Sequence, residues 1–487
     1  MKFIAAAFAA MVLAALPQAA QARWLKAESS RFIVYSDGGE SALRQYVLDI
    51  EVFDSLLRAR HGLPESGAPL RKLPIYLVRD RSGLQRTWHK AGDSVAGYYS
   101  PGSADVFAVA VMESYDDQQV VFKHEYVHHF MLGSFPGAYP AWMVEGYAEY
   151  YAQTVIKGLY VDVGNVAEWR SYELRNERWI PMADLLANKR PAHEETFYGQ
   201  SWLLTHYMMS SPDRYKQFQT YASLVGKGGD PVQSMVTATG MSPDQLEAAL
   251  RRYMNGKLPG VRYKRTDFTV PTVTITELPP SADALLLDRL QIVSHSCKDT
   301  NAGYLDMIRG KAARFPNDQL AVLALGQAEL ELGDPARGKA LLLDWIKANP
   351  TDVEAMFVLG HNLIWKSDAE TDPDKAKAMR AEARTVLEPA ATLAPNDYRI
   401  LFAYARSRRD EPGFPTVATQ TLLITAYKQA PQVVALRFEL IQVLMARRNL
   451  REAEALLRPL VNAPHGGEVA SRARELMARV QAALKDG

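Results

Sequence analysis

Residues 124–128 read His-Glu-Tyr-Val-His, and the run Trp-Met-Val-Glu-Gly-Tyr-Ala-Glu follows at residues 142–149. Side chains four residues apart on a helix leave the same face one turn apart, so His124 and His128 can bind one metal ion. A hydrolytic zinc site takes three protein ligands and keeps a fourth position for water. Glu145 is the candidate third ligand, because another short helical pattern surrounds it. The two segments together predict a catalytic Zn2+ site.

Three neighbouring side chains have expected roles around this site. Glu125 lies beside the two histidines and is placed to take a proton from the water. Glu149 follows Glu145 by one helical turn, where its carboxylate can accept the free ring N–H of a ligand histidine. The side chain of His129 lies about 100° around the helix from that of His128, so we expect His129 to stay off the ion in a structural role.

At these residues the chain resembles the gluzincin metallopeptidases, the group of thermolysin and aminopeptidase N. In that family a His-Glu-x-x-His helix is followed by a helix with a glutamate ligand, and Glu-Gly-Tyr-Ala-Glu at 145–149 is close to the second motif. The resemblance covers roughly residues 25–260 and implies an α+β, zincin-like fold with peptide-bond hydrolysis by zinc. The Gly-x-Met-Glu-Asn strand that holds the substrate amine in aminopeptidases is missing, which favours an endopeptidase. The motifs look most like those of exported bacterial peptidase-like proteins.

The same resemblance implies two further site predictions. The aminopeptidase branch has a tyrosine at the start of a helix that stabilises the tetrahedral intermediate, and Tyr198 stands at a comparable point. In the family, a strand just before the metal helix pairs with the substrate backbone. This implies a peptide-binding edge within residues 106–111, with the candidate residues Val106, Phe107, Ala108 and Val109. The alternatives are a core aromatic at the helix start for Tyr198 and an ordinary core strand for residues 106–111.

The sequence pattern predicts a signal peptide, a mixed domain and a linker. Residues 1–22 contain a short apolar stretch and end in Ala-Gln-Ala, which indicates cleavage after Ala22 and export, with the periplasm as the expected location. Residues 23–265 contain strand patterns at 31–36, 74–78 and 105–111 and a helix with its apolar face at 43–57, which suits the α+β metallopeptidase domain. Residues 266–281 indicate an extended linker, which packs against a neighbouring part of the chain.

Residues 282–487 have the pattern of an all-α tetratricopeptide solenoid. Leu325-Gly326 recurs as Leu359-Gly360, 34 residues later, which is the tetratricopeptide period. A longer following interval indicates a charged loop insertion around 367–374 between paired helices. We expect about four repeats that bind a peptide or protein partner, with an irregular helical bundle as the alternative.

Composition narrows the range of functions. Cys297 is the single cysteine, so no intramolecular disulfide can form. Removal of the signal peptide also removes Lys2 and leaves 55 basic against 55 acidic residues, a balance that does not suggest nucleic-acid binding. We expect no membrane span after signal cleavage.

Two functions fit these observations. The leading hypothesis is an exported zinc endopeptidase whose repeats recruit a peptide or protein substrate, or a partner. The alternative is a non-enzymatic periplasmic scaffold in which the repeats bind a protein partner and the metal site is structural or vestigial. An open fourth coordination position favours the enzyme, and a side chain filling it favours the scaffold.

Overall fold

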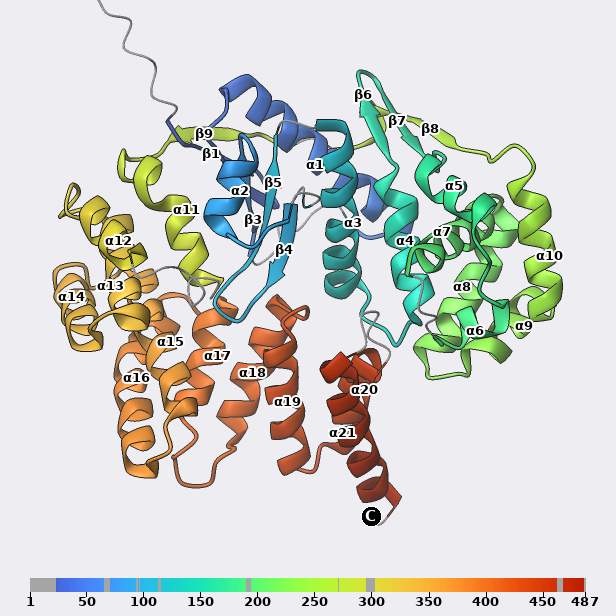
Figure 1. Ribbon diagram of the computed structural model, residues 1–487. Coiled ribbons are helices and arrows are strands. Elements are labelled where there is room, and N and C mark those ends of the chain that lie inside the picture. Colours follow the sequence, from blue (N-terminus) through green and yellow to red (C-terminus); the bar gives the residue numbers. More distant parts are fainter. Residues whose placement is uncertain are drawn as a thin grey trace, which may run out of the picture.

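Figure 1 shows a computed structural model of the chain, in which a mixed sheet with helices on both faces is followed by a curved array of helices. The structure describes residues 23–64, 71–92, 95, 97–112, 115–189, 194–269, 271–294, 303–461 and 467–485. The expected signal peptide and Cys297 lie outside these residues.

A six-stranded sheet forms the centre of the N-terminal part. Its order is β4-β5-β3-β2-β1-β9, with β2, β3 and β5 parallel and the other three strands antiparallel to their neighbours. The strands expected near residues 31–36, 74–78 and 105–111 are confirmed as three of the six, with small shifts at their ends. The six are β1 (Leu25–Glu28), β2 (Phe32–Ser36), β3 (Leu73–Val78), β4 (Gly97–Pro101), β5 (Val106–Val111) and β9 (Thr274–Glu277).

Both faces of the sheet are covered by helices. Successive side chains of a strand point to opposite faces, and in the inner strands both sets are apolar. On one face, β-strand residues such as Phe32 and Ala108 pack against α1 (Glu40–His61) and α3 (Tyr115–Ser134). On the other face, residues such as Phe107 and Val109 pack against α2 (Arg81–Thr87) and α11 (Ser281–Val293). The helix expected around residues 43–57 is confirmed as α1.

The prediction of a peptide-binding edge on β5 is wrong. Strand β5 pairs with β3 on one side and with β4 on the other, and all six of its residues are buried. The backbone groups of Val106, Phe107, Ala108 and Val109 therefore already have partners within the sheet, and an added peptide strand cannot reach them. The alternative of a core strand is the observed one. The edge strand beside α3 is β4, which pairs only with β5 among the described strands.

The expected linker contains a strand of the N-terminal sheet. Residues 266–281 are extended over 274–277, where β9 pairs antiparallel with β1. The next helix, α11, packs beneath the same sheet through Leu287 and Leu290. The linker and the first helix of the C-terminal part are therefore built into the N-terminal fold, and the two parts share a hydrophobic core at this point.

A helical layer beside the sheet carries the second half of the N-terminal part. It consists of α4 (Ala141–Ala152), α5 (Glu168–Asn176), α6 (Met182–Leu186), α7 (Glu194–Met209), α8 (Pro212–Gly226), α9 (Pro231–Thr239) and α10 (Pro243–Met254), with a small sheet of β6 (Val155–Lys157), β7 (Tyr160–Val163) and β8 (Val261–Lys264). Helix α4 packs closely against α7 at Gly146, where an added Cβ would lie 2.2 Å from the carbonyl oxygen of Ser201. The glycine of the Glu-Gly-Tyr-Ala-Glu run is therefore required for this contact.

The C-terminal part is an array of antiparallel helix pairs. After α12 (Tyr304–Ala312), the described residues form four consecutive pairs and a final helix: α13 (Gln319–Leu332) with α14 (Pro335–Ala348), α15 (Val353–Ala369) with α16 (Pro373–Leu393), α17 (Tyr398–Ser407) with α18 (Val417–Gln429), α19 (Val434–Ala446) with α20 (Leu450–Val461), and α21 (Gly467–Lys485). Leu342 and Leu387 fill the space above Gly326 and Gly360, which explains the repeated Leu-Gly pair.

The expected loop insertion around residues 367–374 is wrong. Helices α15 and α16 have 17 and 21 residues, whereas α13 and α14 have 14 each. The extra residues of this repeat lengthen its two helices, and only a short turn joins them. The charged residues continue a solvated helix surface, which the composition alone does not distinguish from a loop.

Ion pairs and hydrogen bonds join the two parts of the chain. Arg71 pairs with Asp105 of the N-terminal part at 2.6 Å and with Asp397 of the helical part at 3.3 Å. The hydroxyl of Tyr398 donates to the carbonyl of Gly102 at 3.0 Å. The helical array is thus fixed to the sheet near the ends of β3 and β5. Among the described residues, no helix is both long and apolar enough to cross a membrane.

Candidate metal centre

The three predicted ligands converge between α3 and α4. Nε2 of His124 lies 3.0 Å from Nε2 of His128. Oε2 of Glu145 lies 3.2 Å from the first of these nitrogens and 3.4 Å from the second. Among the described residues, these three side chains form a cluster whose possible ligand atoms all lie within 4.8 Å of one another. Helix α3 provides the four-residue spacing, and α4 lies against it and supplies the carboxylate.

The spacing of these atoms fits a zinc ion. A tetrahedral ion with ligand bonds of about 2.1 Å separates its ligand atoms by about 3.4 Å, close to the observed distances. The Glu145 side chain is only 1% exposed, so its charge needs a positive partner at this position. Nδ1 of His128 is buried and has no hydrogen-bond partner among the described residues. The donor set of two imidazoles and a carboxylate is one that zinc accepts in catalytic sites.

Glu149 holds His124 in the orientation that a ligand needs. Oε1 of Glu149 lies 3.3 Å from Nδ1 of His124, so the N–H at Nδ1 is bound by Glu149 and Nε2 is the nitrogen left to bind a metal ion. Burial lowers the pKa of His124, but hydrogen bonds with Glu145 and Glu149 outweigh burial and raise it to about 10. The surroundings of His124 therefore favour a positive charge, which a metal ion can supply.

Arg170 on α5 is a contributor that the sequence did not reveal. Its guanidinium donates to both oxygens of Glu149, at 2.9 and 3.0 Å, and to Glu173 at 3.1 Å. Burial raises the pKa of Glu149, yet hydrogen bonds from His124 and Arg170 lower it to about 2. Glu149 is therefore ionised at neutral pH and accepts from the histidine. Arg170 follows no recognisable motif, so only its fold position marks it.

Glu125 and His129 of α3 both interact with Tyr99 of β4. Glu125 is half-buried, and its charge contributes to the raised pKa of Tyr99, for which burial is the main cause. The hydroxyl of Tyr99 lies 2.8 Å from Nδ1 of His129. Burial lowers the pKa of His129 to about 4, so its ring is neutral. As expected from its helical angle, His129 has a hydrogen-bonding role away from the ligand cluster.

A cavity of about 580 Å3 opens beside His124, the one ligand of the three that lines it, and Glu149 and Tyr198 line it too. Glu125 is not among its lining residues. The guanidinium of Arg170 lies over the ring of Tyr198, 5.1 Å from its centroid. Tyr198 therefore shares a cavity with His124 and with the pair of Glu149 and Arg170. Trp169 and Val121 also line the cavity and are 67% and 39% exposed, which gives its mouth an apolar rim.

Comparison with known proteins adds little to this description. No protein-family model matches the chain, and no curated protein matches it. Among solved structures, a thermophilic TPR (tetratricopeptide repeat) protein of Thermus thermophilus is similar, with 18% sequence identity over 41% of this chain and 99% of that chain and a TM-score of 0.32. The overlap is too weak to support an argument. The observed helix pairs therefore define the C-terminal part, and no comparison shows a peptidase family for the N-terminal part.

Proposed function

We propose that the chain is a zinc-dependent peptidase of the gluzincin type, with an endopeptidase as the favoured form. The observation that carries this proposal is the convergence of His124, His128 and Glu145 at 3.0 to 3.4 Å beside an open cavity. A zinc ion held by these three residues would supply a Lewis acid that lowers the pKa of water and polarises a carbonyl.

The remaining residues divide the work of peptide hydrolysis. Glu125 takes the proton of the attacking water and passes it to the leaving amine, because it lies on α3 between the ligand histidines. Tyr198 donates a hydrogen bond to the oxyanion from the cavity wall. Glu149 and Arg170 keep His124 in the ligand tautomer. An extended substrate adds to the outer edge of β4, the edge strand that lies against α3.

Other features of the chain suggest the substrate preference, the recruitment of partners and the location of the protein. The exposed Trp169 and Val121 at the cavity mouth favour a substrate with an apolar side chain next to the cleaved bond. The helical array recruits the substrate or a protein partner, as helical repeats commonly do. The expected signal peptide puts the protein outside the cytoplasm.

The test measures zinc content and peptide cleavage on purified mature protein. We expect about one zinc per chain, and cleavage of an unfolded protein that falls at least about 100-fold in Glu125→Gln while the zinc content stays unchanged. Glu177→Gln, an exposed carboxylate at the end of α5, is the matched control and should behave like the parent. Protein without zinc contradicts the metal site. Protein with zinc but with equal, negligible cleavage by parent and variant favours the scaffold alternative.

A further inference from the structure

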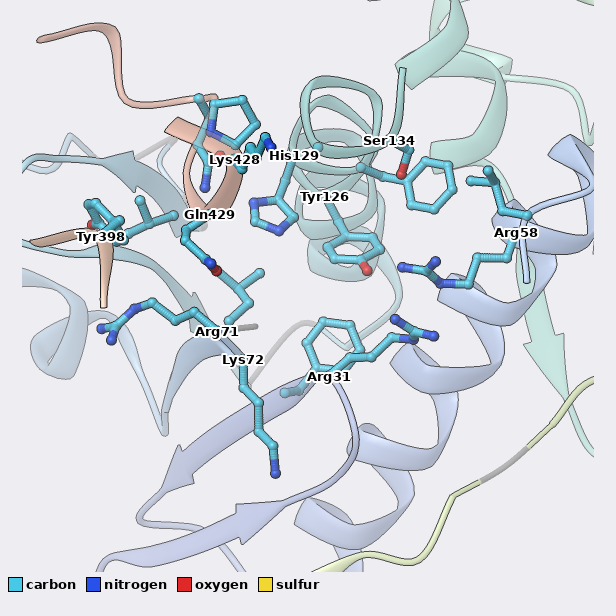
Figure 2. A pocket seen from close by; sticks show the side chains of 18 of the residues that line it. Arg31, Arg58, Arg71, Lys72, Tyr126, His129, Ser134, Tyr398, Lys428 and Gln429 are labelled. Carbon is cyan, nitrogen blue, oxygen red and sulfur yellow. The ribbon is translucent and has the colours of Figure 1, made fainter. Parts of the chain in front are cut away.

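A second cavity lies on the opposite side of α3 from the metal ligands. It has a volume of about 390 Å3 and is enclosed by α3, the beginnings of β2, β3 and β5, and the helical part near α17 and α18. Figure 2 shows positively charged side chains on several of its walls. No carboxylate is among the described residues that line it, whereas five cationic side chains are: Arg31, Arg58, Arg71, Lys72 and Lys428. Of these, Lys72 forms an ion pair with Glu28 at 2.7 Å, so its charge is already matched.

On one wall, a buried carboxylate orients two guanidinium groups. Asp54 is 1% exposed and accepts from Nε of Arg31 at 2.6 Å and from Nε of Arg58 at 2.7 Å. The hydroxyl of Tyr126, from α3, donates to the same carboxylate at 2.7 Å. Since Asp54 binds Nε of Arg58, the terminal nitrogens of Arg58 keep donor capacity for a further acceptor. The carboxylate lies behind the guanidinium groups and does not line the cavity.

On the opposite wall, the cations belong to both parts of the chain. Arg71 is held by Asp105 and Asp397, and its Nε is buried with no hydrogen-bond partner among the described residues. Lys428 lies in the last turn of α18, is exposed, and forms no ion pair with any described residue. Lys428, Tyr398 and Gln429 all belong to the helical part and line the cavity.

We infer that this cavity is a binding site for a ligand with at least two oxyanion groups, carboxylate or phosphate. The terminal nitrogens of Arg58 on one wall and the ammonium of Lys428 on the other fit two such groups, since guanidinium and ammonium groups both bind carboxylate and phosphate oxygens. The apolar side chains between them, including Phe32, Leu73 and Phe130, suit the organic part of the ligand. A ligand here contacts both parts of the chain and strengthens their association. The site is independent of the metal centre.

The ligand can come from two sources with the same chemistry. A free tricarboxylate or a phosphate compound could enter the cavity from solution, and the acidic side chains of a peptide could enter it from a bound protein. The probes are therefore citrate, inorganic phosphate and a synthetic peptide of six residues with alternating glutamates, each titrated into the full mature protein by calorimetry. Sodium chloride at matched ionic strength corrects for unspecific screening.

We expect saturable binding of at least one probe at one site per chain, weakened at least about tenfold by Lys428→Glu. Lys347→Glu is the matched control, because Lys347 is also an exposed last-turn lysine of a helical pair and lies away from the cavity. Lys428→Gln should weaken binding less than the charge reversal. Binding of citrate or phosphate alone assigns a free ligand, and binding of the peptide alone assigns an acidic segment. The inference is overturned if no probe saturates, or if the Lys428 and Lys347 variants bind equally.

Discussion

Helix α3 presents opposite chemistry on two sides. On one side, His124 and His128 lie among the carboxylates of Glu145 and Glu149. On the other, Tyr126 and His129 face a cavity lined by arginines and lysines. Residues one position apart on a helix differ by about 100° in direction, so adjacent histidines enter unlike surroundings. One helix thus lies between the proposed metal site and the proposed oxyanion site, and mutations on its two sides test them separately.

The largest expected effect comes from exchanging each of the two adjacent histidines. His128→Gln should lower zinc affinity at least about 100-fold, because it removes one of three ligands. His129→Gln should keep zinc binding within about threefold, because His129 bonds to Tyr99 and lies off the cluster. Competition with a zinc chelator of known affinity measures both values. Equal losses in the two variants would show that the sides of α3 are not independent.

A smaller effect is expected from Arg170, which binds Glu149 and so supports His124 indirectly. Arg170→Met removes both hydrogen bonds from the guanidinium to Glu149, so the carboxylate holds the histidine less firmly. Zinc affinity should fall about tenfold, the usual range for a partner of a ligand residue. Arg175→Met on the same helix is the control, because Arg175 is exposed.

Arg170→Lys separates charge from geometry in the same measurement. Lysine keeps the positive charge but cannot donate to both carboxylate oxygens in the fixed fork of a guanidinium. Partial recovery of zinc affinity would mean that charge near Glu149 matters most. An affinity equal to that of Arg170→Met would mean that the bidentate geometry is what orients His124. Zinc affinity equal to that of the parent in both Arg170 variants would contradict the positioning role of Arg170.

The cluster of His124, His128 and Glu145 could be predicted from the sequence because its residues lie within two neighbouring segments. The helical period places His124 and His128 on one face, and the resemblance of residues 145–149 to a known ligand motif on a following helix indicated Glu145. The same is true of α1 and of β2 and β3, whose apolar patterns follow directly from burial. Glu149 was predictable for the same reason, since one turn separates it from Glu145.

One error is local, because the loop expected around residues 367–374 is a lengthening of α15 and α16. The other failures concern relations between distant segments. The six apolar residues of β5 indicate a buried strand, but they do not say that β4 pairs on its outer side. Arg170 reaches Glu149 across 21 positions, and no period connects them. The cationic cavity is built from residues as far apart as Arg31 and Lys428, so it exists only in the folded chain. Local pattern specifies elements, whereas sheet order and inter-part packing depend on tertiary contacts.

The smallest expected effect is a loss of folding stability at low pH caused by His61, a histidine that lies among aromatic rings and not among carboxylates. His61, at the end of α1, contacts the rings of Phe130 and Phe135 and bonds through Nε2 to the hydroxyl of Tyr147. Burial lowers its pKa from 6.5 to about 4. The unfolded chain therefore takes up a proton as the pH falls through 6.5, while the folded chain does not until about 4, so folding stability is lost across this window.

Urea unfolding at pH 7.5, 6.5 and 5.5 with a chelator present measures this loss. We expect His61 to account for about 1 kcal/mol of the decrease in unfolding free energy by pH 5.5, so His61→Gln should show a shallower pH dependence whatever its stability at pH 7.5. Gln keeps an amide that can bond to Tyr147 but cannot take up a proton in this range. Parallel pH profiles would mean that His61 is hydrated enough to titrate normally. The difference between the apolar surroundings of His61 and the acidic surroundings of His124 would then be smaller than the burial of His61 implies.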